Sequence, residues 1–490
     1  VKKFEKKYNQ EKIDKYIQSI EAELEELDYN DPKDKRKIVS REQKISNIKA
    51  GIFTTKKEQE LIRPINLGSS VDLPALMYSE EGFHFEVIKN NESGKPSTDE
   101  ETLTNLRLTV KKPDSPKAIF LDRLLELRGL EKMYKTYIEG WNEKVQDDDR
   151  LHGRFLIHGT TSGRLSSAEP NAQQIPKTSV DPNIKLQLKA PKGTLYIASD
   201  FSQAELRIMA HLSGDETYLN AFNSGQDPHL AIAATKYHIP YEEALKIYED
   251  ENHPEHKIWK VRRKQAKQIA FGLIYGIGAK LLAVKLSDPK SGIIVTPEEA
   301  QKEMDIFFGQ HPKLKTFLKK QEKFLRKNGH LVSLFGRKRR LPQIYSNDKG
   351  EEAYALRLAL NFPCQSAASD MCLFGSILIY YLMRQGKLPS TKSVCLVHDA
   401  NYQITKPENI NIWSIYEMWQ IYRNPLTKPY FGFQIDDVTM DMEFVIGRSM
   451  AEELPFIPGY DYKKMLEPDF SVEEYMEEHK KYKHIPISEY

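Results

Sequence analysis

The 490-residue sequence has little cysteine, no long apolar run and no targeting signal. Its three cysteines, Cys364, Cys372 and Cys395, lack the spacing of a zinc site, and an odd number inside apolar runs predicts buried thiols in a reducing compartment. No window approaches 18 uninterrupted apolar residues, and the Lys-rich start has no apolar signal segment. We therefore expect no disulfide, structural zinc, membrane span or secretion, and two to four packed units.

Neither sign of charge dominates overall, with 72 Lys/Arg against 70 Asp/Glu, but both are unevenly distributed. Residues 257–345 contain 21 Lys/Arg and 6 Asp/Glu, whereas residues 436–490 contain 6 and 14. A solvated charged face is the usual explanation of a Lys-rich stretch. Because the cations here cluster, for example in the run 337–340, the sequence favours a polyanion such as nucleic acid as the partner.

Hydrophobic periodicity predicts a mixed α and β chain. The predicted elements are helices over 13–27 and 121–141, a strand over 195–199, a helix from about Ser202, mostly helical structure over 215–345 and two short strands between 393 and 405.

Two aspartates follow predicted strands. Asp200 ends the strand over 195–199, and Asp399 lies in the hairpin turn between the last two strands. Because strand ends can be neighbours in one sheet, the carboxylates could converge and hold two divalent cations, and their oxygen atoms suit Mg²⁺. Ordinary turn chemistry is the alternative, since Asp favours such positions for local hydrogen bonds, and spacing alone favours it.

A second candidate site is a stripe at four-residue spacing, Arg263, Lys267, Phe271 and Tyr275. On a helix such residues drift by about 40° per step, which gives one stripe roughly 18 Å long. Its cations could meet the phosphates of a nucleoside triphosphate and its rings the base and sugar. The alternatives are a core stripe for the rings and a solvated face for the cations.

Ser202 and Glu205 have the spacing of a helix capping box, with Ser202 at the N-cap and Glu205 at N3. This structural interpretation is strong, and spacing does not decide whether Glu205 faces its own helix or a ligand.

Several segments resemble the motifs of family A DNA polymerases, the DNA polymerase I-like group. Residues 200–207 (Asp-Phe-Ser-Gln-Ala-Glu-Leu-Arg) resemble the first palm motif, residues 263–276 the fingers helix and residues 396–399 (Leu-Val-His-Asp) the last palm motif. Residues 161–167 and 170–176 are similar to the segment that holds the primer-template duplex. Several separated motifs in the right order make coincidence negligible.

The resemblance implies an α+β right-hand fold with an antiparallel β-sheet palm, helical fingers and a helical thumb. The domains that it implies are a lead-in over 1–19, a thumb over 20–150, palm over 151–215, fingers over 216–345 and palm again over 346–490. We expect no 3′–5′ exonuclease domain and no proofreading, because too few residues precede the thumb.

The resemblance also implies the activity, template-directed addition of deoxynucleotides to a primer 3′-hydroxyl with release of pyrophosphate, in replication or repair. Asp200, Asp399 and the Phe201 carbonyl would hold two Mg²⁺ ions, for which Mn²⁺ can substitute, and Lys267 is a candidate general acid. The implied nucleotide-binding residues are Arg263, Lys267, Phe271, Tyr275, Glu205, Gln203 and His229, with Glu205 as the steric gate against ribose. The implied DNA-binding residues are Lys132, Arg164, Asn171, Gln173, Arg357, Asn361, Gln365 and His398.

Three residues depart from the family pattern. Ala400 stands where the last motif usually has glutamate, so we expect weaker metal affinity but not inactivity. Ala270 stands where many relatives have asparagine. Phe271, in place of tyrosine, predicts discrimination against dideoxynucleotides.

The expected partners are primer-template DNA, deoxynucleoside triphosphates, and replisome proteins or an upstream fused nuclease, helicase or primase, with no membrane. The expected location is the cytoplasm of a bacterium or phage-infected cell, or alternatively an organelle matrix.

Two other functions compete with DNA synthesis. Glu205 and the duplex-binding segment argue against a single-subunit RNA polymerase, and Ala400 makes a catalytically silent DNA-binding protein conceivable.

Overall fold

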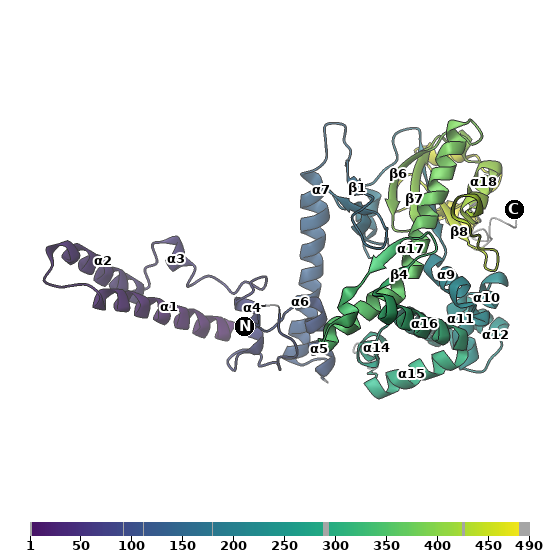
Figure 1. Cartoon of the computed structure of the whole chain (residues 1–490). Helices are drawn as coiled ribbons and strands as arrows, with labels where there is room; N and C mark the ends of the chain where they lie inside the picture. Colours follow the sequence, from purple (N-terminus) through teal and green to yellow (C-terminus); the bar gives the residue numbers. More distant parts are fainter. Residues whose placement is uncertain are drawn as a thin grey trace. The chain divides into compact units, whose positions relative to one another are not determined.

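The computed structural model describes residues 2–91, 93–110, 112–178, 180–287, 294–423 and 427–479 (Figure 1). The described residues divide into two compact units. The first unit takes those of 1–132 and 288–294, and the second unit takes those of 133–287 and 295–490.

The first unit is helical. Its helices are α1 (Lys2–Glu25), α2 (Pro32–Lys49), α3 (Lys56–Gln59), α4 (Asp72–Tyr78), α5 (Glu100–Thr109) and α6 (Pro116–Met133). The predicted charged helix is α1, and the break after it arises because Asp31 caps α2 and Pro32 occupies its first turn. Figure 1 shows α1 and α2 side by side, and Ile17, Ile20 and Ile45 belong to the apolar cluster that joins them.

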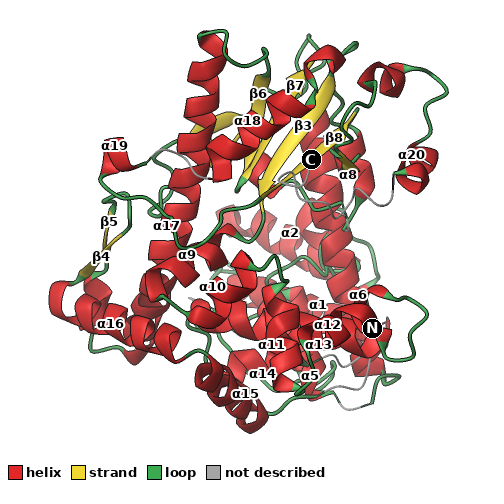
Figure 2. Ribbon diagram, turned by 90° about the vertical axis from the view of Figure 1, so that its right-hand side faces the viewer, coloured by secondary structure: helices red, strands yellow, loops and turns green. Residues whose placement is uncertain are grey.

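The second unit is built on one five-stranded antiparallel sheet (Figure 2). Its strands, in spatial order, are β6 (Lys392–Val397), β7 (Ala400–Thr405), β3 (Leu195–Phe201), β8 (Met442–Gly447) and β9 (Leu454–Pro455). Leu195, Ile197 and Phe201 alternate along β3 into the large core of this unit. The strand predicted at 195–199 and the hairpin between 393 and 405 are therefore confirmed.

Helices account for most of the chain after β3, as predicted for 215–345. They are α9 (Ala204–Ser213), α10 (Glu216–Asn223), α11 (Pro228–Lys236), α12 (Tyr241–Glu249), α13 (His256–Ile274), α14 (Ala279–Leu286), α15 (Pro297–Gln310), α16 (Pro312–Asn328), α17 (Lys349–Arg384), α18 (Ile412–Arg423), α19 (Lys428–Phe431) and α20 (Val472–Glu478). Shorter elements include α7 (Gly140–Asn142), α8 (Pro182–Leu186), and the hairpins β1 (Arg154–Leu156) with β2 (Ser166–Ala168) and β4 (His330–Val332) with β5 (Lys338–Arg340).

The long helix α17 passes through the core of the second unit. Gly375 lets it approach α18 closely, because a Cβ there would lie 2.5 Å from the Tyr422 ring. Among the described helices, α17 alone is long and apolar enough to cross a membrane by length and composition, which the sequence analysis did not expect. Half of that apolar window is buried inside the protein, as in a core helix. The three cysteines are free, and Cys395 is only partly buried.

Candidate functional site

The sheet brings the two predicted aspartates together. Asp200 lies near the end of β3, and Asp399 lies in the two-residue turn between β6 and β7. In the strand register Asp200 is opposite Ala400, the residue after Asp399, on one side and opposite Glu443 of β8 on the other. Directly opposed residues of antiparallel strands share a face of the sheet, so Asp200 and Glu443 face the same way.

The electrostatics around Asp200 disfavour its anion. Partial desolvation by the surrounding protein raises the pKa of Asp200 to about 7, although the residue remains exposed to water. The negative charges of Asp399 and Glu443 raise this pKa further, and the positive charge of Lys177 lowers it. A bound cation would relieve this repulsion. Within the described ranges no three His, Cys, Asp or Glu side chains form a metal-binding group. The oxygen donors that the sequence analysis predicted remain the two aspartates and the Phe201 carbonyl.

The turn that carries Asp399 is held from outside the sheet by Gln173. The Gln173 side chain accepts a hydrogen bond from the His398 backbone N–H at 2.8 Å and donates one to the Leu396 carbonyl. Asn171 in turn accepts from the Gln173 backbone N–H at 3.0 Å. The predicted DNA-binding residues Gln173 and Asn171 therefore already make hydrogen bonds that position the turn.

The predicted capping box is wrong. Helix α9 begins at Ala204, and its N-cap residue is Gln203, which has a left-handed φ of 58° and makes no side-chain capping hydrogen bond. The side-chain Oε1 atom of Gln203 is buried and has no hydrogen-bond partner among the described residues. Because the chain turns sharply at Gln203, the Ser202 side chain does not cap the helix.

The carboxylate of Glu205 points away from its own helix start and binds two residues from other segments. It accepts hydrogen bonds from the Arg164 guanidinium and the Tyr275 hydroxyl. The pKa of Tyr275 is raised well above its usual value, first by burial and then by Glu205. Arg164 and Tyr275 were both predicted site residues, and the structure places them on one carboxylate.

The predicted stripe on α13 is present. Lys267 lies 5.8 Å from the centroid of the Phe271 ring, and the rings of Phe271 and Tyr275 are 6.1 Å apart. Tyr275 is the C-cap residue, so the stripe ends with the helix. Arg263 forms an ion pair with Asp227 at 2.5 Å. Burial lowers the pKa of Lys267, and Arg263 lowers it further.

His229 of α11 lies beside this stripe. Its ring is 5.7 Å from Phe271, and only 1% of the residue is exposed. Neither ring nitrogen has a hydrogen-bond partner among the described residues. Burial holds the pKa of His229 well below its usual range, against the opposing effect of Asp227, so the ring is neutral at pH 7.

The remaining predicted residues lie on two helices. Arg357, Asn361 and Gln365 are spaced four residues apart on α17. Asn361 has a buried side-chain oxygen without a hydrogen-bond partner in the described part of the chain. Lys132 is exposed near the end of α6 and belongs to the first unit.

Sequence reasoning did not select three charged neighbours of these sites. They are Asp227, which pairs with Arg263; Lys177, which affects the pKa of Asp200 and Lys267; and Arg337, which pairs with Asp370 at 2.7 Å. Arg337 also lies against Gly163, where φ is 86° and a Cβ would be 2.3 Å from the guanidinium. The basic run at 337–340 indicated a positively charged region, but it did not indicate the individual contacts of Arg337.

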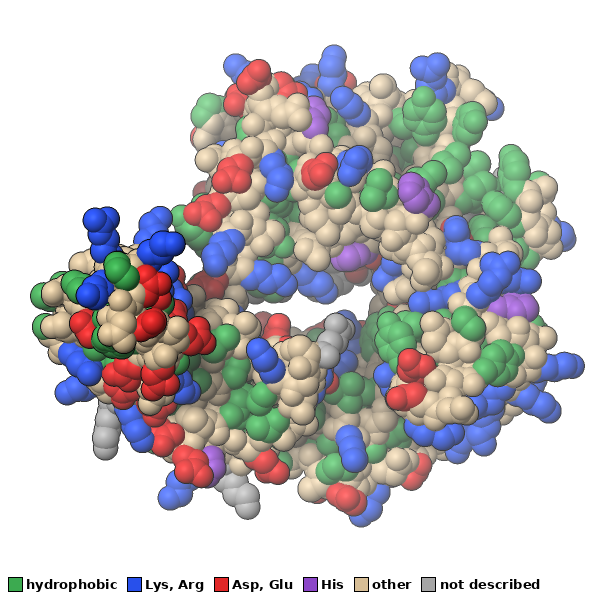
Figure 3. All heavy atoms as spheres, turned by 60° about the vertical axis from the view of Figure 1, so that its left-hand side comes forward, with side chains coloured by type: hydrophobic (Ala, Val, Ile, Leu, Met, Phe, Trp, Pro, Cys, Tyr) green, Lys and Arg blue, Asp and Glu red, His purple; other side chains and the backbone are tan. Residues whose placement is uncertain are grey.

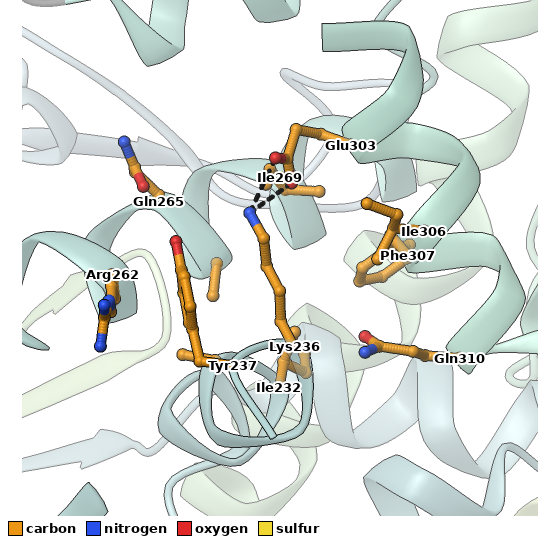
Figure 4. A pocket seen from close by; sticks show the side chains of 12 residues that line it. Ile232, Lys236, Tyr237, Arg262, Gln265, Ile269, Glu303, Ile306, Phe307 and Gln310 are labelled. Carbon is orange, nitrogen blue, oxygen red and sulfur yellow. Dashed lines mark hydrogen bonds and ion pairs between the residues drawn. The ribbon is translucent and has the colours of Figure 1, made fainter. Parts of the chain in front are cut away.

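The opposite side of α13 lines a small pocket with α11 and α15 (Figure 4). Its volume is about 20 Å³, room for about one water molecule. Lys236 reaches across it to both carboxylate oxygens of Glu303 at 2.7 Å, and Arg262 lies over the Tyr237 ring. This pocket is too small for a nucleotide.

An antiparallel sheet with two aspartates at adjoining strand ends, beside a helix bearing cations and rings, defines the palm and fingers of a right-hand polymerase fold. The sequence model described as DNA polymerase family A matches residues 36–411. The chain belongs to this family.

Relatives and a solved structure agree with this assignment. The chain is 32% identical over 319 residues to thermostable DNA polymerase I of Thermus aquaticus, covering 65% of the chain and 35% of the relative. It is 32% identical over 336 residues to DNA polymerase I of Pseudomonas aeruginosa, covering 68% and 33%. The chain thus spans about a third of the length of these relatives.

The similar solved structure is the POL domain of Pol1 from M. smegmatis in complex with DNA primer-template and dNTP. Its TM-score is 0.64 and its identity 29%, over 80% of this chain and 62% of that one. The right-hand fold with an antiparallel palm, helical fingers and helical thumb is therefore confirmed.

Proposed function

We propose that this chain is a template-directed DNA polymerase that adds deoxynucleotides to a primer 3′-hydroxyl and releases pyrophosphate. The observation that carries the proposal is the convergence of Asp200 and Asp399 at adjoining strand ends, in a family A chain that also has the α13 stripe. The primer-template and dNTP in the related mycobacterial structure support the same substrates.

Two divalent cations, Mg²⁺ or Mn²⁺, fit the donor set of Asp200, Asp399 and the Phe201 carbonyl. All three donors are oxygen atoms, which Mg²⁺ prefers, and the crowded charge that raises the pKa of Asp200 favours a cation. Bound there, the ions would lower the pKa of the primer hydroxyl and stabilise charge on the departing pyrophosphate.

The α13 stripe would bind the incoming nucleotide. Arg263 and Lys267 supply positive charge for the phosphates, and Phe271 and Tyr275 supply the rings beside base and sugar. The lowered pKa of Lys267 makes its ammonium group a better proton donor to pyrophosphate near neutral pH. His229, whose neutral ring has no hydrogen-bond partner among the residues that the structure describes, and Gln203 would contribute further contacts to the nucleotide.

Glu205 would select deoxynucleotides. Arg164 and the Tyr275 hydroxyl hold its carboxylate in one orientation, so that it fills the space a ribose 2′-hydroxyl needs. This role requires only that the carboxylate keeps a fixed position.

Basic and amide side chains would hold the duplex. We assign contacts with its backbone and minor groove to Lys132, Arg164, Asn171, Gln173, Arg357, Asn361, Gln365 and His398.

We assign the domains as lead-in 1–19, thumb 20–150, palm 151–215 and 346–490, and fingers 216–345. A protein with these substrates works where DNA is replicated, in the cytoplasm of a bacterium or phage-infected cell, or in an organelle matrix.

Primer extension tests the proposal. A labelled recessed primer with Mg²⁺ and deoxynucleotides should be extended by the parent, not by Asp399→Ala, and poorly with ribonucleotides. Asp436→Ala, which removes an exposed aspartate before β8, is the control and should extend normally. Efficient ribonucleotide use without a primer would instead establish an RNA polymerase, and tight binding without extension a silent DNA-binding protein.

Ala400 gives a separate prediction about metal affinity. Ala400→Glu adds a carboxylate directly opposite Asp200 on β7, so we expect half-maximal extension at a lower Mg²⁺ concentration. Titration of Mg²⁺ and Mn²⁺ against extension rate measures this. A variant that needs as much metal as the parent would show that a carboxylate at position 400 adds nothing beside Glu443.

A further inference from the structure

Helix α16 presents a strongly basic outer side. It contains seven Lys/Arg and one Glu, and all seven cations are exposed. Its buried residues are Leu314, Phe317, Leu318 and Leu325. Figure 3 shows that Lys and Arg side chains gather in patches on the face it presents, among them one at the lower right.

Most of these cations are not neutralised by the protein. Lys313 and Arg326 take part in ion pairs, and Lys315 lies 5.7 Å from the centroid of an aromatic ring. Within the ranges that the structure describes, five cations of α16 form no ion pair, and they are Lys315, Lys319, Lys320, Lys323 and Lys327. A surface that leaves so much charge of one sign uncompensated attracts anions.

Exposed aromatic rings stand among these cations. Phe324 is 45% exposed, and its ring meets His330 of β4 edge-on at 5.9 Å. Tyr345 is 60% exposed and packs over Gly329, where a Cβ would lie 3.1 Å from the Tyr345 ring. Arg340 is directly opposite His330 in the β4–β5 hairpin, so both side chains leave the same face.

The helical spacing places cations and ring in one stripe. Lys320, Lys323, Phe324 and Lys327 are related by steps of three and four residues, and the three lysines span about 10 Å along the helix. The group is named the α16 surface, and its residues are Lys320, Lys323, Phe324, Lys327, His330 and Arg340.

We propose that the α16 surface binds the single-stranded template ahead of the primer end. Cations attract the phosphates, and exposed rings stack on unpaired bases, the combination used by proteins that bind single strands without sequence preference. Paired bases in a duplex are already stacked, so a surface for duplex alone would need the cations but not the rings. The inference rests on the proposed function, because it assigns the template as the ligand.

The binding experiment compares template overhangs. Fluorescence anisotropy would measure the affinity for primer-templates with 5′ template overhangs of about one and about twelve nucleotides, a range that brackets typical single-strand sites. The test variant is Lys320→Gln/Lys323→Gln/Lys327→Gln. The matched control, Lys406→Gln/Lys463→Gln/Lys464→Gln, removes three exposed lysines elsewhere in the second unit.

We expect the test variant to bind the long overhang about tenfold more weakly at moderate salt, with the short overhang nearly unaffected. Loss of three phosphate contacts to a single strand should also reduce the slope of log affinity against log salt by about two. Phe324→Ala should weaken the long-overhang complex with little change in that slope, and Phe324→Trp should retain the affinity because it can still stack. Circular dichroism melting would confirm that each variant is folded.

Three results would overturn the proposal: equal loss on both overhangs, equal loss in the lysine control, or no loss at all. The first would assign the surface to duplex, and the second would mean that only overall charge matters. If the proposed function itself is wrong, the parent protein will extend no primer. Its affinity for the two overhangs can still be measured in that case, so the two failures are distinguishable.

Discussion

Glu205 shows that a residue can fit the sequence pattern of a helix cap and still make its hydrogen bonds with residues elsewhere in the fold. Its spacing from Ser202 matches a capping box, yet Gln203 adopts a left-handed conformation and the helix begins one residue later. The carboxylate is thereby released to accept hydrogen bonds from Arg164 and Tyr275, which come from distant segments. Local spacing predicted a helix start there but not the partner of this side chain.

Tyr275→Phe tests whether the orientation of Glu205 matters. The change removes one hydrogen bond to a charged group, a loss of about 1.5–3 kcal/mol, and should lower discrimination against ribonucleotides by about tenfold. The measurement is the ratio of kcat/KM for deoxynucleotide and ribonucleotide addition. Tyr354→Phe, on an exposed tyrosine, is the control and should leave the ratio unchanged. Unchanged discrimination in Tyr275→Phe would mean that Arg164 alone holds the gate.

His229 predicts a pH dependence of stability. Its pKa in the folded protein is below that of the unfolded chain, so the neutral ring contributes stability above about pH 6.5 that is lost as the pH falls. His229→Asn cannot titrate, and its melting temperature should fall less than that of the parent between pH 7 and pH 5. The exposed His158→Asn serves as control. Parallel curves for parent and His229→Asn would contradict the prediction.

At the scale of elements, the β6–β7 hairpin depends on a segment outside the sheet. The turn residue His398 has a φ of 57°, which is unfavourable for a residue with a side chain. The Gln173 amide bonds the backbone on both sides of the strand end, at Leu396 and His398. The position of Asp399 therefore depends on Gln173, which the sequence analysis assigned to DNA binding.

Gln173→Ala removes both of these hydrogen bonds. At about 1 kcal/mol each, their loss should lower the free energy of unfolding by about 2 kcal/mol and, by loosening the Asp399 turn, reduce kcat about tenfold. Denaturant unfolding and single-nucleotide extension measure the two effects. Gln174→Ala changes the exposed neighbouring amide and should change neither. If kcat is retained, the turn is held by the sheet alone.

At the scale of the whole molecule, the two units have separate apolar cores. Leu103 and Leu121 lie in the core of the first unit, and Leu230 lies in that of the second, all fully buried. Both charge-biased stretches of the sequence, the basic one and the acidic one, belong to the second unit apart from a few residues of the first. The uneven charge is therefore largely a property of one unit.

Calorimetry can test whether the units unfold separately. Leu121→Ala should cost about 3 kcal/mol and lower one thermal transition, while Leu230→Ala should lower the other. Each substitution is the matched control of the other, because both remove the same atoms from a fully buried site. A single transition that both substitutions lower would show that the units unfold together.

The sequence by itself determined the motif residues, the two strand ends that bear Asp200 and Asp399, and the α13 stripe, because each depends on a period or turn within a few residues of chain. The tertiary structure alone decided the antiparallel register that brings Asp200 opposite Ala400 and Glu443, the partners of Glu205 and the support of Asp399 by Gln173. These contacts join segments far apart in the chain. They form because buried backbone and polar groups must find hydrogen-bond partners and because each strand must turn its apolar side chains to the core. No local sequence pattern specifies which distant segment supplies those partners.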